Sequence, residues 1–148
     1  MRARAAKAKP RPKAYILDEQ VGFILRQVSQ RHATLFAGLM GSGITPTQWA
    51  ALAKLYEVGP TSQNLLGRMT AMDVATIKGV VDRLRKRGLI CVSADEDDAR
   101  RRLVALTGKG RDLLDSKFAV AQAISKDTLA PLDGGEQAEF LRLLEKMK

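Results

Sequence analysis

Residues 73–107 restrict the possible folds of this 148-residue chain more than any other stretch. Asp73 can cap a helix at its N-terminus. The apolar side chains that follow recur at three- and four-residue steps, which predicts one buried helix face: Ile77, Val80, Val81 and Leu84. Gly88 ends this helix, and two short apolar runs of β type follow at 89–92 and 103–106. The order of helix, glycine stop and β-hairpin with a charged tip predicts a basic wing directly after a helix.

A shorter helix is expected just before this stretch. Thr61 and Ser62 begin it and residues 63–69 form it, so that a tight turn separates it from Asp73. Two helices joined in this way are typical of a helix-turn-helix, whose second helix enters the major groove of DNA. The second helix has a polar outer face: Thr76, Lys78, Gly79, Asp82 and Arg83. The pattern therefore favours a DNA-binding regulator over an enzyme. The basic end of this helix, residues 85–87, is interpreted as a solvated surface that grazes the DNA backbone.

Long helices are expected on both sides of the module. Residues 14–40 carry one apolar stripe: Leu17, Val21, Ile24, Leu25, Val28, Leu35, Phe36 and Leu39. Thr107 can cap a second long helix, and Asp133 can begin a final one. A winged module can bury its own core, which leaves little within one chain to cover these stripes. A second copy related by two-fold symmetry is the commonest solution.

Between these parts, Thr45 and Gln48 can form a capping box that begins another helix, and Pro46 suits its first helical position. Its inner side is expected to hold Trp49, Leu52, Leu55 and Tyr56.

We therefore expect a mainly α fold with a small β-hairpin wing. It comprises a basic arm at 1–13 and a single domain at 14–148, with the winged helix-turn-helix at about 45–107. Dimerisation helices are expected at about 14–40 and 108–148.

The charge of the chain favours an anionic partner. The net charge is +9, and six of the basic residues lie among the first 13 positions, which contain no acid. That arm is interpreted either as a solvated tail or as one that contacts phosphate or a minor groove.

Other features narrow the class of protein. No apolar run is long enough to span a membrane, no secretory signal is recognisable and Cys91 is the only cysteine, so we expect a cytoplasmic protein. Cys91 lies in an apolar β run, where a buried, inert thiol is expected; redox sensing is the alternative. No P-loop, dinucleotide fingerprint, nucleophile elbow or metal-ligand spacing occurs, so no catalysis, cofactor or metal is expected.

The chain resembles the MarR family of winged helix-turn-helix regulators. Four stretches carry the resemblance: residues 45–52, 80–90, 95–100 and 106–110. The resemblance implies a homodimer that binds a pseudo-palindromic operator in double-stranded DNA, usually as a repressor released by a small aromatic or anionic effector. Two positions depart from the family pattern: Ala99 stands where Arg is common, and Glu96 replaces the usual Pro.

The resemblance also implies roles for single residues. Ser62 and Gln63 begin the helix that touches the DNA backbone, while Thr76, Lys78, Gly79 and Arg83 face the major groove or its phosphates. Arg100 matches the arginine that enters the minor groove and Asp98 the acid that orients it. Arg101 and Arg102 are alternatives for the groove contact.

A ligand site is a further hypothesis. Arg31 and His32 could meet a carboxylate, and Phe36 and Trp49 could stack on an aromatic ring. The alternatives are that Trp49 is an ordinary core residue and His32 a partly buried histidine with an internal partner. For the whole chain, the alternative to a DNA reader is a winged-helix protein-interaction module.

Overall fold

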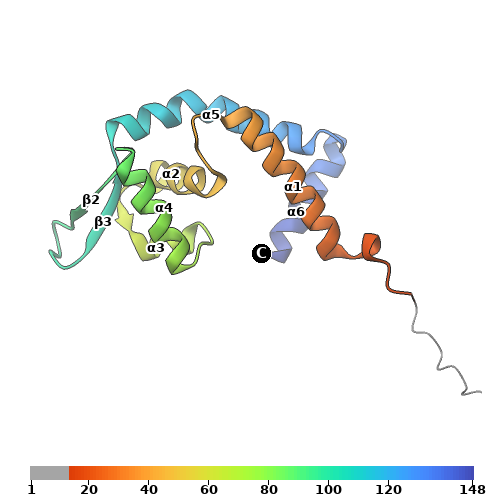
Figure 1. Cartoon of the computed structure of the whole chain (residues 1–148), viewed down its shortest axis with the longest axis horizontal. Helices are drawn as coiled ribbons and strands as arrows, with labels where there is room; N and C mark the ends of the chain where they lie inside the picture. The colour runs from red at the N-terminus through yellow and green to blue at the C-terminus, as the bar shows by residue number, and fades with distance from the viewer. Residues whose placement is uncertain (1–13) are drawn as a thin grey trace, which may run out of the picture.

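The structure, a computed structural model, describes residues 14–148 (Figure 1). The basic arm expected at 1–13 lies outside the described residues. The first element of the described residues is a 3-10 turn, η1 (Leu17–Glu19). The helices are α1 (Val21–Met40), α2 (Pro46–Val58), α3 (Gln63–Met69), α4 (Val74–Lys86), α5 (Gly108–Leu129) and α6 (Gly134–Met147). The strands are β1 (Thr61–Ser62), β2 (Ile90–Ala94) and β3 (Arg102–Leu106).

Helix α5 joins two parts of the molecule. Figure 1 shows α2, α3, α4 and the hairpin at one end of α5, and α1 and α6 at the other. This arrangement separates the winged helix-turn-helix from the terminal helices, and it agrees with the mainly α fold that the sequence predicts.

The local signals at the helix starts are confirmed. Thr45 accepts a bond from the Gln48 amide while the Gln48 side chain accepts from the Thr45 amide, so the capping box is complete. Asp133 forms a second capping box with Glu136. The N-terminal helix, expected from residue 14, begins instead at Val21. Gln20 has an extended backbone, with ψ of 130°, which separates η1 from α1.

The sheet has one strand more than the sequence predicts. Its order is β1-β3-β2, and both pairings are antiparallel, with Thr61 opposite Val104 and Ile90 opposite Leu106. β1 is only two residues long, so it carries no recognisable periodicity of its own.

Cys91 corrects the expectation of a buried thiol. It is exposed, whereas its neighbour Ile90 is buried. Successive side chains of a strand point to opposite faces, and only the face that holds Ile90 is covered by the core.

The core lies in the winged module and along the inner side of α5. It includes Leu52, Leu66, Ile77, Leu84 and Leu114, each at most 1% exposed. By contrast, α6 holds no buried residue, and α1 holds only Phe36 and Met40. The apolar stripes of the terminal helices therefore remain largely uncovered within one chain.

Helix α2 differs in detail from the expectation. Leu52 and Leu55 are buried, but Tyr56 is exposed and Trp49 is half-buried. Both aromatic rings pack edge-on against Phe118 of α5, with ring centroids 5.9 Å away for Trp49 and 5.0 Å for Tyr56.

Candidate nucleic-acid interface and ligand cavity

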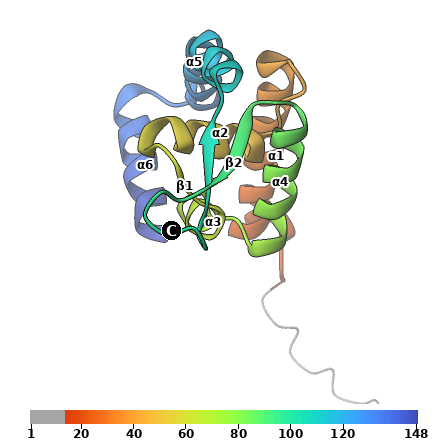
Figure 2. The ribbon, with the colours of Figure 1, turned by 90° about the vertical axis from the view of Figure 1, so that its left-hand side faces the viewer.

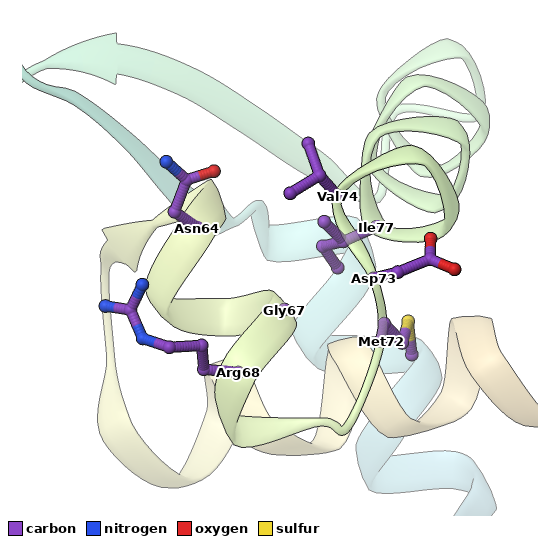
Figure 3. A pocket seen from close by; sticks show the side chains of 7 residues that line it. All are labelled: Asn64, Gly67, Arg68, Met72, Asp73, Val74 and Ile77. Atoms are coloured by element: carbon purple, nitrogen blue, oxygen red, sulfur yellow. The ribbon is translucent and has the colours of Figure 1, made fainter.

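Helices α3 and α4 pack closely because a glycine stands where they meet. A Cβ on Gly67 would lie 3.0 Å from Ile77 Cγ2, so Gly67 lets α4 pack closely on α3 (Figure 3). Ala71 takes a left-handed conformation, with φ of 54°, which reverses the chain. The first turn of α4 is then fixed by Asp73, whose carboxylate accepts from the Thr76 amide at 2.7 Å. This bond lowers the pKa of Asp73 below its ordinary value.

The outer face of α4 is exposed as the sequence predicts. Ile77, Val80, Val81 and Leu84 are buried, and Thr76, Lys78, Asp82 and Arg83 are exposed. The Lys78 ammonium pairs with Asp82 at 3.1 Å. The Arg83 guanidinium lies back over Gly79, 3.4 Å from where a Cβ would stand, which leaves Gly79 half-buried.

The two residues predicted to contact the DNA backbone, Ser62 and Gln63, lie at the start of α3. The Ser62 hydroxyl caps α3 by accepting from the Leu65 amide at 3.3 Å, and Gln63 is half-buried beside it.

The tip of the wing is held by its acids. Asp98 accepts from the Arg100 amide at 3.0 Å, and its carboxylate lies 3.5 Å from Arg100 Nε. Asp95 stands 3.9 Å from the Arg101 guanidinium. Arg100 is the more available of the two arginines, with 93% of its side chain exposed against 59% for Arg101. Arg102 is also exposed and pairs with Ala94 in the sheet.

The end of α4 departs from the expected solvated surface at one residue. The Arg87 guanidinium donates to the carbonyls of Ser42 and Gly43, at 2.7 and 3.1 Å. Arg87 therefore ties the C-terminus of α4 to the loop between α1 and α2, while Arg85 and Lys86 remain exposed.

A groove of about 330 Å³ lies between α3 and α4. Figure 3 labels the residues that line it, and the sequence did not single out Asn64, Arg68, Met72 or Val74. Asn64 and Val74 point toward its open side, and Arg68 points outward from α3. Val74 is 70% exposed. An apolar residue three positions before the buried Ile77 gives no sequence signal of this exposure.

The structure brings three of the four predicted ligand residues together. His32, Phe36 and Trp49 line one cavity of about 130 Å³ with Ala121, Ile124 and Ser125. The cavity therefore lies where α1, α2 and α5 meet. Trp49 both lines this cavity and packs on Phe118, so the core interpretation and the ligand interpretation of Trp49 are compatible.

Arg31 is placed apart from the other three. Its guanidinium donates to the carbonyls of Asp127 and Thr128, at 2.7 and 2.6 Å, in the last turn of α5. Arg31 lines a neighbouring, mainly apolar cavity of about 250 Å³ with Val28, Leu132 and Phe140. His32 has an internal partner, because Nδ1 lies 2.8 Å from the Thr128 hydroxyl.

The comparisons with known proteins agree with this architecture. The model of the MarR family matches residues 44–101, which span the helix-turn-helix, β2 and the tip of the wing. The transcriptional repressor NicR of Pseudomonas putida is 40% identical over 134 residues, covering 90% of this chain and 85% of NicR. The chain belongs to the MarR family.

Solved structures of similar proteins have the same fold. A probable transcriptional regulator from Pseudomonas aeruginosa is 57% identical, with a TM-score of 0.88 over 90% of this chain and all of that one. BpsR of Bordetella bronchiseptica is 37% identical, with a TM-score of 0.87 over 91% of this chain and 97% of that one. The DNA binding of BpsR is regulated by 6-hydroxynicotinic acid.

This MarR-family chain is thus a DNA-binding transcriptional regulator with a winged helix-turn-helix. Within the part that the structure describes, no helix is both long and apolar enough to cross a membrane.

Proposed function

We propose that the protein is a homodimeric repressor that reads a pseudo-palindromic operator through α4 and the wing. One observation carries this proposal. The N-terminal end of α4, helix α3 and the tip of the β2–β3 hairpin all lie toward the same lower edge in both views (Figures 1 and 2). A duplex laid along that edge would meet the α4 outer face and Arg100 together.

In the major groove, Thr76, Lys78 and Arg83 supply the contacts to base edges or phosphates. Arg83 turns from Gly79 toward the DNA, and the uncovered Gly79 then lets the α4 backbone approach closely. Ser62 and Gln63, at the start of α3, contact the DNA backbone. Lys78 can exchange its exposed pairing with Asp82 for a phosphate, because a surface ion pair of this kind is weak.

At the wing, Arg100 enters the minor groove, where A·T-rich sequence gives the deepest negative potential. Its exposure and its contact with Asp98 favour it over Arg101, which stands beside Asp95, and over Arg102, which belongs to a strand. Arg101 and Arg102 then contact the flanking phosphates.

The effector is proposed to be a single-ring aromatic carboxylic acid bound between His32, Phe36 and Trp49. Phe36 and Trp49 offer ring contacts, and His32 offers a polar atom. The regulation of BpsR by 6-hydroxynicotinic acid makes hydroxylated pyridine or benzene carboxylates the first compounds to test. Arg31 contributes indirectly, by holding the last turn of α5 beside the cavity.

The cavity lies between the reading module, through α2, and the terminal helices, through α1 and α5. An effector that binds one relative arrangement of these helices more tightly would shift the population toward it. Repression is relieved if that arrangement sets the two α4 helices at a spacing that the operator cannot accept. The required half-site spacing is about 10 bp, one turn of duplex.

The test is an operator titration with single alanine variants at fixed salt. Arg100→Ala should weaken binding by about 1–3 kcal/mol, the usual scale for a groove contact. Lys54→Ala, which removes the same charge from α2 where Lys54 pairs with Glu57, is the matched control and should leave binding nearly unchanged. Equal effects of the two variants would contradict the role of the wing.

The rival function, a winged-helix protein-interaction module, predicts no preference for a selected duplex over a random one. The proposed repressor should instead bind a selected duplex much more tightly than a random one. We further propose that the protein acts in the cytoplasm and has no catalytic activity of its own.

A further inference from the structure

Thr128, in the last turn of α5, is a polar residue whose two bonds the proposed function does not yet use. Its hydroxyl oxygen lies 2.8 Å from the Ile124 carbonyl, to which it donates, and 2.8 Å from His32 Nδ1. The hydroxyl therefore bridges the α5 backbone and the only histidine of the chain. His32 lines the proposed ligand cavity, whereas Thr128 lines the neighbouring cavity that Arg31 also lines.

The proton count at this bridge selects one form of the neutral imidazole. A threonine hydroxyl has one hydrogen, and the Ile124 carbonyl can only accept it. The contact between Oγ1 and Nδ1 then contains a hydrogen only if Nδ1 carries it. With the proton on Nε2, the hydroxyl would have to turn its hydrogen from the Ile124 carbonyl to Nδ1, and that carbonyl would keep only its helix bond within α5.

Nε2 is thereby left as an acceptor. Among the described residues no side chain or backbone group bonds to it, and His32 is half-buried on the wall of the cavity. Arg31, the strongest donor nearby, is committed to the carbonyls of Asp127 and Thr128. A ligand in this cavity would therefore bind more tightly if it donated a hydrogen bond to His32 Nε2.

We infer that Thr128 is a positioning residue for effector recognition. It fixes His32 in the Nδ1–H tautomer, so that Nε2 selects aromatic acids that present a hydroxyl or ring N–H donor over acids that lack one. This inference rests on the proposed ligand cavity and narrows the class of its occupant. Thr128 itself touches the histidine and not the effector.

The first measurement is the tautomer of His32. Nitrogen chemical shifts of the ¹⁵N-labelled, full-length chain without a histidine tag report one imidazole, at a pH where the ring is neutral. The wild type and Thr128→Ser should carry the proton on Nδ1, whereas Thr128→Val should shift it toward Nε2. A proton on Nε2 in the wild type, or an unchanged tautomer in Thr128→Val, would overturn the inference.

The second measurement is the selectivity for the donor. Calorimetry at the same pH would compare 6-hydroxynicotinate with nicotinate and 4-hydroxybenzoate with benzoate. The wild type and Thr128→Ser should favour the hydroxylated member of at least one pair by about tenfold, the usual cost of leaving a buried acceptor unpaired. Thr128→Val should reduce that ratio to about one.

The outcomes distinguish a failure of the proposed ligand cavity from a failure of the role given to Thr128. A wild type that binds none of the four acids would overturn the ligand cavity itself, and the inference with it. A wild type that binds the paired acids equally would leave the cavity standing and overturn only the role of Thr128. Operator binding without effector serves as the folding control, and it should be the same for all three proteins. If Thr128→Val failed this control, the wild-type and Thr128→Ser data would still decide the tautomer and the preference.

Discussion

Val74 exposes most of its side chain in the first turn of α4, at the edge where α3 and the wing tip also lie. The N-terminal residues of a recognition helix are those that contact base edges. An apolar side chain there has one specific partner in the major groove, the methyl group of thymine. Val74 is therefore expected to contribute to base selection beside Thr76 and Lys78.

Replacing a thymidine of the operator by deoxyuridine removes only the methyl group of the base. Val74→Ala should weaken binding to a selected operator by about 1 kcal/mol, and deoxyuridine at the contacted step should weaken wild-type binding by a similar amount. The two changes together should cost little more than either alone, because each removes the same contact. Fluorescence polarisation titrations would measure all four combinations.

Val58→Ala provides the control, since Val58 is an exposed apolar residue at the end of α2. It should respond to deoxyuridine as the wild type does. If Val74→Ala also kept the full sensitivity to deoxyuridine, Val74 would not contact the methyl.

Single residues with local signals could be predicted from the sequence. Asp73 and Thr45 cap their helices because capping needs only a side chain and an amide three residues away. Val74 and Cys91 could not be placed in this way. Their exposure depends on which faces of α4 and β2 other elements cover, and periodicity shows only that a residue is apolar.

At the scale of elements, Gly110 joins the wing to α5. A Cβ at this position would lie 2.0 Å from the Leu89 carbonyl oxygen, which is backbone and cannot swing aside. Thr107 completes the junction, since its hydroxyl donates to the Gly88 carbonyl at 2.6 Å and accepts from the Gly110 amide. Gly110, the second glycine of the 106–110 motif, is thus required by the close approach of two backbones.

Gly110→Ala should destabilise the fold by about 3 kcal/mol, the upper end of the usual cost of overpacking. Gly108, two residues earlier in the same helix, has nothing within 4 Å of its Cβ position and is the matched control. Gly108→Ala should leave stability unchanged or raise it by up to about 1 kcal/mol. Urea unfolding of both variants gives the comparison, and equal stabilities would disprove the steric account.

The Asp73 cap gives α4 a pH dependence of known sign. Its bond to the Thr76 amide lowers the folded-state pKa below the ordinary 3.8. The ionised cap therefore stabilises the fold fully above the ordinary value, and this contribution is lost as the pH falls through the lower folded-state pKa.

Asp73→Ala should be less stable than the wild type at neutral pH, and the difference should shrink as the solution is acidified. Asp73→Ser keeps a capping oxygen without a titratable group, so it should differ from Asp73→Ala by an amount that does not depend on pH. Unfolding curves over a pH series test both statements. A wild-type advantage that persisted undiminished in acid would contradict the assigned cause.

The elements themselves were largely predictable, and the exceptions have physical reasons. The helices α2 to α6 have strong caps or breaks, whereas β1 is a strand only because β3 lies beside it. The ligand cavity was predictable in part. His32 and Phe36 share one face of α1, but the sequence does not show that Arg31 turns to the α5 carbonyls instead.

At the scale of the whole molecule, the terminal helices carry more exposed apolar surface than one chain can cover. Val21, Ile24, Leu25 and Val28 on α1 are each at least 40% exposed, and so are Leu141, Leu143 and Met147 on α6. Figure 1 shows these two helices at the end of the molecule away from the wing. Exposed apolar residues gathered on helices at one end are typical of an interface, and a symmetric dimer through these helices would set the two α4 helices at a fixed separation.

Leu25→Asp places a charge in the middle of this face and should convert the dimer to a monomer, because an unpaired charge is costly to bury. Val58→Asp introduces the same charge on exposed apolar surface of α2 and should remain dimeric. Analytical ultracentrifugation measures the oligomeric state, and titration with full operators and half-sites measures the consequence. The monomer should bind a full operator no more tightly than a half-site, since the second α4 is no longer tethered at the matching distance. A monomeric wild type, or a Leu25→Asp dimer that binds as the wild type does, would show that these helices serve a different contact.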